Sequence, residues 1–155
     1  MYHPRVEVEA IRRMRPDELE AIVGIWRRSR EDAQPWLEAR MAHSGADDLR
    51  HFRDVVAIAN EVWVAVANGA PVALMALRPG FIDQLYVDPS AQKLGVGTAL
   101  LDHAKRACPQ GLALFTHQRN ERARAFYERR GFAGVAFGVS PPPESEPDVR
   151  YEWRA

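Results

Sequence analysis

The sequence predicts an α/β fold in which helices flank a mixed β-sheet, and three observations lead to this class. The chain has 155 residues, close to the usual size of one domain and enough to bury a full hydrophobic core. Its composition, 46% hydrophobic and 27% charged, is that of an ordinary globular protein. Strand-like and helix-like segments alternate along its second half, without an internal repeat. We therefore expect one domain that spans residues 1–155.

The opening segments are predicted to be one strand and two helices. Residues 6–11 alternate in polarity as a strand does, and Asp17 is suited to cap the helix that follows. Apolar residues at helical spacing predict that first helix: Leu19, Ile22, Val23 and Trp26. A polar stretch around residues 34–45 follows. A second helix is predicted from about Asp47, with one apolar face formed by Leu49, Phe52, Val56 and Ala59.

Three strands are predicted next. Residues 62–67 and 72–77 are strand-like, and the dipeptide Asn68-Gly69 between them suits the positive φ angles of a tight hairpin turn. Pro79-Gly80 interrupts the chain before a third strand at residues 81–87, which Asp88-Pro89 ends.

The second half alternates helices and strands. We expect a helix over about residues 95–107 with Leu100, Leu101 and Ala104 facing inward, and a helix that stops at Gly131. The remaining predicted segments, in order, are a strand at 112–116, the helix at about 120–130, a strand at 132–139, a proline-rich connection at 141–147 and a last strand at 149–153. Val149, Tyr151 and Trp153 would form the buried face of that last strand.

Charge and composition argue against several classes of function. Lys+Arg and Asp+Glu are both 21, so no bulk charge attracts nucleic acid or an anionic membrane. The single cysteine, Cys108, excludes an internal disulfide, and the histidines lack metal-ligand spacing, so we expect no metal site. No apolar run resembles a signal peptide or a membrane span. We expect a cytoplasmic protein.

The most informative stretch lies between a predicted strand and a predicted helix and reads Gln92-Lys93-Leu94-Gly95-Val96-Gly97-Thr98. Two glycines let the backbone turn tightly and approach a ligand, and the free N–H groups at the helix start favour an anion such as a pyrophosphate. Leu100 stands where a dinucleotide fingerprint needs its third glycine, which argues against a Rossmann site. A tight turn that binds nothing is the alternative.

Two motifs resemble those of one family. The pattern Gln92-x-x-Gly95-x-Gly97, after the strand that ends at Val87, resembles the acetyl-CoA signature of the GNAT superfamily of N-acetyltransferases. Residues 120–132, NERARAFYERRGF, resemble its second motif at the usual separation. The resemblance covers essentially the whole chain. It implies the GNAT acyl-CoA N-acyltransferase fold, whose central, mostly antiparallel sheet splays between the fourth and fifth strands.

The resemblance also implies roles for individual residues. The pyrophosphate of coenzyme A would be held by Gln92, Lys93, Leu94, Gly95, Val96, Gly97 and Thr98. The backbone near Val87 would pair with the pantetheine arm in the splay, Asn120 would hydrogen-bond that arm, and Tyr127 would lie by the thioester sulfur. Trp36 and the proline-rich residues 141–147 would border the acceptor pocket.

Acetyl transfer to an amine needs two proton transfers. An amine with a pKa of about 10 is mostly protonated at neutral pH and must lose a proton before it attacks. The departing thiolate needs a proton, and the Tyr127 phenol fits that acid role; a purely structural aromatic is the alternative. Many relatives carry a glutamate as base where this chain has Phe81, so the sequence departs from the pattern. Asp83 is our first candidate, because it lies two residues after Phe81 and therefore on the same face of the strand. His117, at the end of the next strand, is the second, and a chain of waters is a third solution.

We therefore expect an acetyl-CoA-dependent N-acetyltransferase that acts by direct transfer in a ternary complex. The acceptor would be a primary amine of a small molecule or of a protein, and the enzyme would be a monomer or homodimer. Two alternatives remain: a transferase with a longer acyl donor, and a non-catalytic acyl-CoA-binding sensor, against which the presence of Tyr127 argues.

Overall fold

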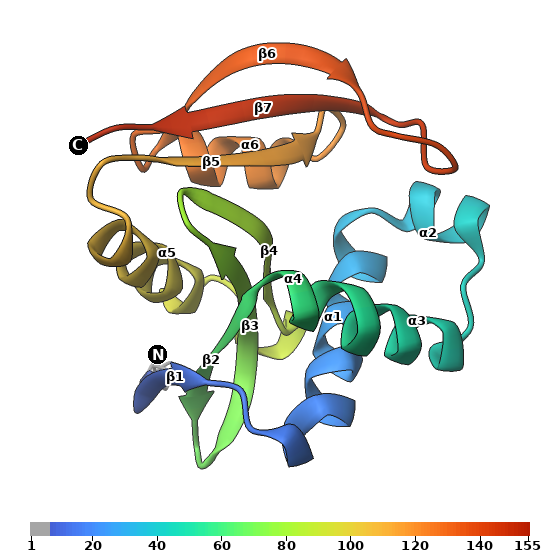
Figure 1. Cartoon of the computed structure of the whole chain (residues 1–155), viewed down its shortest axis with the longest axis vertical. Helices are drawn as coiled ribbons and strands as arrows, with labels where there is room; N and C mark the ends of the chain where they lie inside the picture. The colour runs from blue at the N-terminus through green and yellow to red at the C-terminus, as the bar shows by residue number, and fades with distance from the viewer. Residues whose placement is uncertain (1–6) are drawn as a thin grey trace, which may run out of the picture.

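A seven-stranded sheet forms the centre of the computed structural model, which describes residues 7–155 (Figure 1). The strand order is β1-β2-β3-β4-β5-β7-β6, and only the pair β4–β5 is parallel. The strands are β1 (Ala10–Arg13), β2 (Glu61–Ala67), β3 (Ala70–Arg78), β4 (Phe81–Val87), β5 (Leu112–His117), β6 (Ala133–Val139) and β7 (Pro147–Trp153). The predicted fold class, a mixed and mostly antiparallel sheet flanked by helices, is confirmed.

The helical segments lie on both sides of this sheet. They are η1 (Pro16–Glu18), α1 (Leu19–Ala33), α2 (Pro35–Met41), α3 (Gly45–His51), η2 (Phe52–Val56), α4 (Ala57–Ala59), η3 (Pro89–Ala91), α5 (Val96–Ala107) and α6 (Glu121–Glu128). No helix within residues 7–155 is both long and apolar enough to cross a membrane.

Strand β3 separates two hydrophobic cores, because successive side chains of a strand point to opposite faces. Met75 packs with α5 and α6, together with Leu100 and Tyr127, whereas Leu74 packs with α1 and η2 around Ile22. Both faces of the central strand are therefore covered, and the sheet is held from two sides.

The sheet opens between β4 and β5. The two strands share one residue pair, Phe81 with Ala113, and the Ala113 N–H donates to the Gly80 carbonyl at 2.9 Å. No further pair joins them within residues 7–155, so the rest of β4 borders a gap. The expected splay between the fourth and fifth strands is confirmed.

Several local predictions agree with the structure. Strand β4 has the predicted bounds, and the hairpin turn holds Asn68 and Gly69 at φ angles of +52° and +77°. Asn120 caps α6 by accepting the Ala123 N–H at 3.1 Å, and Gly131 has a φ of +89° just beyond that helix.

Other local predictions were wrong. The opening strand begins at Ala10 rather than at residue 6, which lies outside the described residues. Asp17 does not cap α1 but lies within the η1 turn, where the neighbouring Glu18 carboxylate accepts the Arg15 N–H. The polar stretch contains helix α2, and α3 begins at Gly45 because Ser44 accepts the Asp47 N–H at 3.0 Å.

Candidate active site

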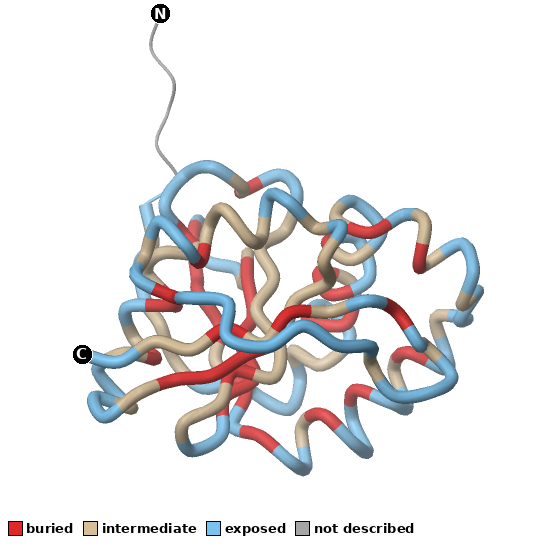
Figure 2. Tube along the Cα trace, turned by 90° about the horizontal axis from the view of Figure 1, so that it is seen from above, coloured by how far each residue is buried: buried red, intermediate tan, exposed pale blue. Residues whose placement is uncertain are grey.

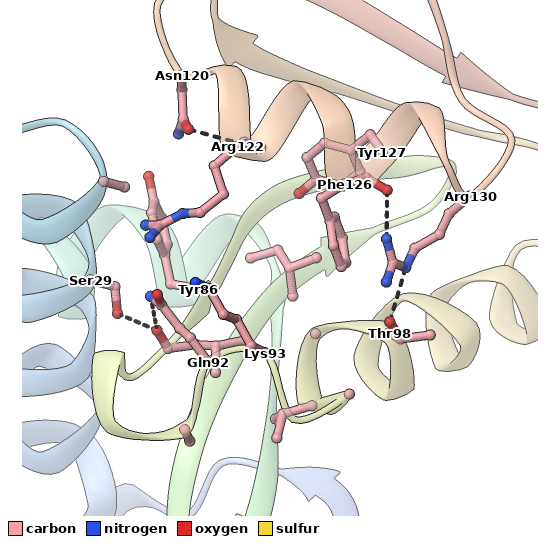
Figure 3. A pocket seen from close by; sticks show the side chains of 18 of the residues that line it. Ser29, Tyr86, Gln92, Lys93, Thr98, Asn120, Arg122, Phe126, Tyr127 and Arg130 are labelled. Carbon is pink, nitrogen blue, oxygen red and sulfur yellow. Dashed lines mark hydrogen bonds between the residues drawn. The ribbon is translucent and has the colours of Figure 1, made fainter.

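A cavity of about 490 Å³ lies where β4 leaves the sheet, between the start of α5 and helix α6 (Figure 3). All but one of the residues predicted to hold the cofactor line it: Val87, Gln92, Lys93, Gly95, Val96, Gly97, Thr98, Asn120 and Tyr127. The exception is Leu94, whose side chain is exposed. The structure thus brings two motifs that are distant in the sequence to one cavity.

The backbone of β4 presents unpaired polar groups to this gap. The Asp88 N–H donates to the Val72 carbonyl at 2.8 Å, which fixes the alternation of hydrogen bonds between β3 and β4. It follows that the N–H and C=O groups of Leu85 and Val87 point away from β3, toward the missing β5 partner. The Val87 carbonyl already accepts from Gln92 Nε2 and Ser29 Oγ, both at 3.1 Å. An extended amide-bearing ligand can pair with the remaining groups, as an added strand would.

The loop after β4 forms an anion site at the start of α5. Gly95 has a φ of +81° and Lys93 a φ of +64°, so the chain turns sharply before the helix. The first helical hydrogen bond joins the Ala99 N–H to the Gly95 carbonyl at 3.0 Å. The N–H groups of the first turn therefore have no partner in the helix and face the cavity with the positive end of its dipole.

Gly97 is needed for close packing of α5 against its neighbours, not for the turn that precedes this helix. A Cβ atom at this position would lie 3.3 Å from the Phe126 ring and 3.5 Å from Val87. The glycine thus lets α5 approach α6 and β4 closely, which keeps the cavity narrow.

Basic side chains surround the cavity, and sequence reasoning missed most of them. Lys93, Arg122, Arg129 and Arg130 line it, whereas no acidic side chain of residues 7–155 does. The Arg130 Nε donates to Thr98 Oγ1 at 2.9 Å, and its guanidinium lies 3.9 Å from the Phe126 ring centroid (Figure 3). The only signal in the sequence was the pair of arginines before Gly131. This charge suits a ligand with several phosphates.

A second cavity of about 1230 Å³ meets the first one. It runs from α1 and α3 across β4, β5 and β7 to β6 and the following loop. Both cavities are lined by Leu85, Tyr86, Asn120, Ala123 and Tyr127. Groups bound in the two cavities would therefore come together at these residues.

Two tyrosines lie at this junction. Tyr127 is 7% exposed, and burial raises the pKa of its phenol well above the usual value. Burial likewise raises the pKa of Tyr86 to about 12, an effect that the nearby Arg30 guanidinium partly offsets. Both phenols thus keep their protons at neutral pH. Tyr86 lies on β4 and was not predicted as a site residue.

Asp83 lines the second cavity but is held by other side chains. Its carboxylate accepts a hydrogen bond from Asn60 Nδ2 at 2.9 Å and lies 4.0 Å from Arg78 Nη1. The register between β3 and β4 shifts by one residue at this point, between Ala76 and Leu77. The strict alternation that was used to relate Asp83 to Phe81 therefore does not hold here.

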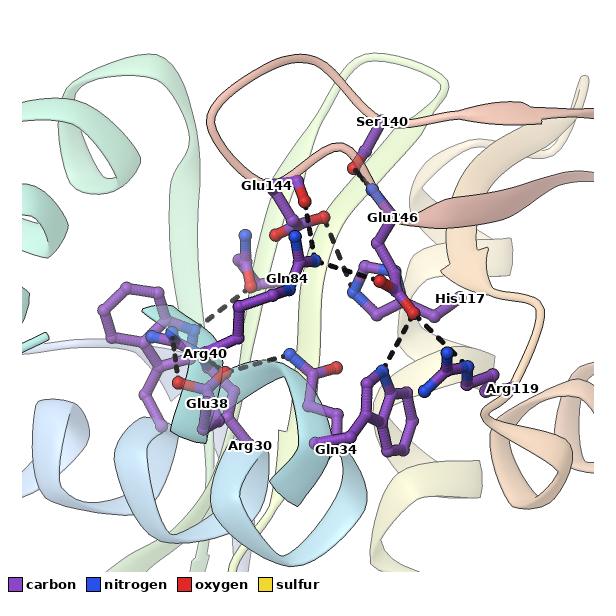
Figure 4. Close-up of polar contacts among 12 residues, drawn as sticks. Arg30, Gln34, Glu38, Arg40, Gln84, His117, Arg119, Ser140, Glu144 and Glu146 are labelled. Carbon is purple, nitrogen blue, oxygen red and sulfur yellow. Dashed lines mark hydrogen bonds and ion pairs between the residues drawn. The ribbon is translucent and has the colours of Figure 1, made fainter. Parts of the chain in front are cut away.

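His117 lies at the end of β5 in the wall of the second cavity (Figure 4). Its Nδ1 atom is buried and makes no hydrogen bond with residues 7–155, and its Nε2 atom lies 3.6 Å from Glu144 Oε1. Asp148 is its cross-strand partner on β7 and lies on the same face of the sheet. His117 therefore combines an unpaired nitrogen with two neighbouring carboxylates.

The buried Glu146, just before β7, connects α2 with the segment between β5 and α6 (Figure 4). Its carboxylate accepts from Trp36 Nε1 and Arg40 Nη2 of α2, both at 2.9 Å, and lies 3.6 Å from Arg119 Nε. Trp36 does not line the second cavity, so its expected place at the border of the acceptor pocket is not observed. Pro141, Pro143 and Glu144 of the proline-rich segment do line it.

The comparisons with known proteins agree with this geometry. Residues 14–132 match the model of the acetyltransferase (GNAT) family. The peptidyl-lysine N-acetyltransferase YjaB of Escherichia coli (strain K12) is 35% identical over 126 residues, which are 81% of this chain and 82% of YjaB. The solution structure of YjaB in its apo form has a TM-score of 0.76 at 30% identity and covers 94% of this chain and 98% of that chain.

A more distant solved structure shows likeness of fold alone. It is a putative streptothricin acetyltransferase from Bacillus anthracis in complex with acetyl coenzyme A, with a TM-score of 0.56 and 22% identity. The match covers 65% of this chain and 69% of that chain.

Proposed function

This chain belongs to the acetyltransferase (GNAT) family and is an N-acetyltransferase, and we propose that it transfers the acetyl group of acetyl-CoA directly to a lysine side chain of a polypeptide. The observation that carries the proposal is the meeting of two cavities at Tyr127, one basic and one large and open. Donor and acceptor can occupy them together, so no acetylated enzyme is needed.

The first cavity suits coenzyme A. The free backbone groups of Leu85 and Val87 fit the amides of a pantetheine arm, and Asn120 Nδ2, which makes no hydrogen bond within residues 7–155, can reach the same arm. The start of α5 together with Lys93 and Arg130 fits the phosphates. The donor supplies a thioester whose sulfur leaves as a thiolate.

The second cavity favours a polypeptide acceptor. Its size exceeds what a small amine fills, and it opens along the outer face of β5, β7 and β6. The relative YjaB is by its name a peptidyl-lysine N-acetyltransferase. A lysine side chain is long enough to place its amine at the junction while its backbone stays in the open part.

The chain supplies both proton transfers in this proposal. His117 accepts a proton from the lysine ammonium, directly or through water, because its imidazole lies in the wall of the acceptor cavity beside the Glu144 carboxylate. Asp83 is the second candidate, since Asn60 and Arg78 already engage its carboxylate. Tyr127 donates a proton to the leaving sulfur and regains one from the nitrogen as the tetrahedral intermediate collapses to the amide. The Leu85 N–H, at the junction of the two cavities, is available to the carbonyl oxygen, while the Leu85 C=O and the Val87 N–H pair with the pantetheine arm.

Release of coenzyme A thiol in an amine panel tests the proposal. The panel contains N-terminally blocked peptides with one lysine, the same peptides with arginine instead, free lysine and small amines, each with acetyl-CoA or a longer acyl-CoA. We expect release with lysine peptides and acetyl-CoA, and none with the arginine peptides. Binding of acetyl-CoA without release for any amine would favour the sensor alternative.

A further inference from the structure

Tyr86 places a hydroxyl at the junction of the two cavities. Its strand, β4, is half-buried along almost its whole length, whereas residues 73–77 of the neighbouring β3 are buried (Figure 2). The ring of Tyr86 packs against the core on the α1 side, and the residue lines both cavities. Its hydroxyl makes no hydrogen bond with residues 7–155. This polar group, which the fold does not use, is therefore available to a substrate.

The two tyrosines at the junction reach it from opposite faces of the sheet. Tyr86 pairs with Leu74 of β3, and both side chains face α1 and η2. Tyr127 packs with Met75 on the other face. Burial raises the pKa of the Tyr127 phenol, and the nearby Tyr86 adds to this rise, so the two phenols lie within electrostatic reach of each other. A thioester held between them would have Tyr127 beside its sulfur and Tyr86 on the acceptor side.

The charges around the Tyr86 hydroxyl favour a cation. Burial raises the pKa of this phenol to about 12; the Arg30 guanidinium opposes the rise, and the carboxylates of Glu38, Glu144 and Asp83 add to it. Arg30 is itself balanced by Glu38, to which it donates from Nε at 3.0 Å and from Nη2 at 2.8 Å. The remaining carboxylates attract an ammonium and repel an oxyanion. An acceptor amine therefore suits this position better than the oxygen of the acetyl group.

The next side chain on the same face of β4 cannot take the place of Tyr86. Gln84 lies two residues earlier and also lines the second cavity. Its Oε1 already accepts from Trp26 Nε1 at 3.1 Å. Its amide nitrogen is a donor and cannot bind an ammonium, whereas a phenol oxygen can accept a hydrogen bond while it keeps its own proton.

We propose that the Tyr86 hydroxyl is a further catalytic group that holds the attacking amine: its oxygen accepts a hydrogen bond from the acceptor nitrogen and directs the nitrogen lone pair toward the thioester carbon. This role rests on the proposed placement of donor and acceptor in the two cavities. Tyr86 neither gains nor loses a proton, since His117 takes the ammonium proton and Tyr127 protonates the sulfur. Its contribution is orientation, which is a large part of catalysis when two substrates react in one complex.

Tyr86→Phe tests this role, because it removes the hydroxyl and keeps the ring in its packing. Two acceptors are compared: an N-terminally blocked lysine peptide, and n-butylamine, which carries the same amine without a peptide backbone. We expect kcat/KM for both amines to fall about tenfold to a hundredfold, as on loss of a hydrogen bond to a charged group, while calorimetric affinity for acetyl-CoA stays within about twofold. A several-fold loss should remain at alkaline pH, where the loss expected for His117→Gln disappears.

Tyr151→Phe is the matched control. Tyr151 lines neither cavity, and its hydroxyl accepts from Arg124 Nε at 3.0 Å and donates to Glu128 Oε2 at 2.7 Å. We expect this variant to melt at a lower temperature and to keep the wild-type KM for both amines, whereas Tyr86→Phe should keep the melting temperature and lose the amine.

Calorimetric titration of each amine into the complex of enzyme and coenzyme A gives a readout without turnover. We expect both amines to bind the wild-type complex more tightly than the Tyr86→Phe complex. Equal amine affinity and equal kcat/KM in the two proteins overturn the proposal, as does a loss of acetyl-CoA affinity that accounts for the whole effect. A wild type that acetylates butylamine but no lysine peptide contradicts the polypeptide acceptor, while the comparison on butylamine still decides the role of Tyr86.

Discussion

At the scale of single residues, Tyr127 combines burial with access to both cavities. Its ring packs against Phe126, Phe132 and Tyr151 at centroid distances of 5.1, 5.5 and 6.2 Å. The ring is therefore part of the core, as expected if Tyr127 were a purely structural aromatic. The hydroxyl adds a proton that burial keeps on the oxygen, so one side chain can serve packing and catalysis.

Tyr127→Phe separates these two roles. The substitution keeps the ring and its packing but removes the proton donor, and general acid catalysis typically contributes about 10²- to 10⁴-fold. We expect single-turnover acetyl transfer to fall within that range, while calorimetric affinity for acetyl-CoA changes little. Transfer within about threefold of the wild-type rate, with chemistry rate-limiting, would show that the thiolate leaves without this acid.

His117→Gln and Asp83→Asn distinguish the two candidate bases. A lysine amine has an ordinary pKa of about 10.4, so the need for a base is greatest at neutral pH and disappears in alkali. We expect His117→Gln to slow turnover strongly at neutral pH and to recover as the pH rises, and Asp83→Asn to keep the wild-type profile. The pH–rate profile on a lysine peptide gives the answer. If Asp83→Asn loses activity and His117→Gln does not, the assignment reverses; two unchanged profiles would favour a water relay.

Sequence reasoning could predict the residues of the phosphate loop but not their surroundings. Gly95 and Asn120 have local roles, a positive φ and a helix cap, that a motif encodes directly. Arg130 is held at the cavity by its hydrogen bond to Thr98 and by its contact with the Phe126 ring. The position of Asp83 is changed by the shift in register between β3 and β4. Both depend on contacts between distant segments, which local spacing does not reveal.

At the scale of elements, helix α5 does two things at its first turn. Its free N–H groups face the cavity, and Gly97 lets it pack closely against Phe126 of α6. The sequence predicted this helix within one residue because its apolar spacing and its glycines agree. Helix α2 was missed because Gln34, Pro35 and Trp36 suggested a loop, whereas the proline occupies the first helical position, where it is tolerated.

Gly97→Glu should abolish binding of acetyl-CoA. The new side chain would start 3.3 Å from the Phe126 ring, and its carboxylate would repel the phosphates at the helix start. Gly24→Glu is a matched control in α1, where a Cβ would meet only the flexible Arg28 side chain, at 3.1 Å. We expect calorimetry to show no binding for the first variant and wild-type affinity for the second. Unchanged affinity in folded Gly97→Glu would place the pyrophosphate elsewhere.

At the scale of the whole molecule, the sheet consists of two parts joined at one residue pair. Within residues 7–155, the backbone pairing between strands β1 to β4 and strands β5, β7 and β6 is limited to Phe81 and Ala113. The remaining contact consists of packed side chains, such as the ring of Phe81 against that of Phe115, and of the helices packed across both parts. The order of elements along the chain predicted a mixed α/β sheet, whereas the splay between the fourth and fifth strands was implied by the resemblance of two motifs to the GNAT superfamily. The exposure of β6 could not be predicted, since its apolar residues suggest a buried strand.

Acetyl-CoA should stabilise the molecule by joining the two parts of the sheet. A ligand that binds only the folded state adds about 2.7 kcal/mol to the free energy of unfolding at one hundred times its dissociation constant. For a chain of this size, each kcal/mol raises the melting temperature by about 2–4 °C, so we expect a rise of about 5–11 °C. Because the ligand would pair with β4 and contact α6, it should also slow hydrogen exchange at Leu85 and Val87, whose amides face the gap, more than at Tyr86, whose amide already pairs with β3. Thermal melts and exchange followed by NMR measure the two effects on one sample. A higher melting temperature without this alternating protection would mean that the ligand binds the loop and helix α5 but does not extend along β4.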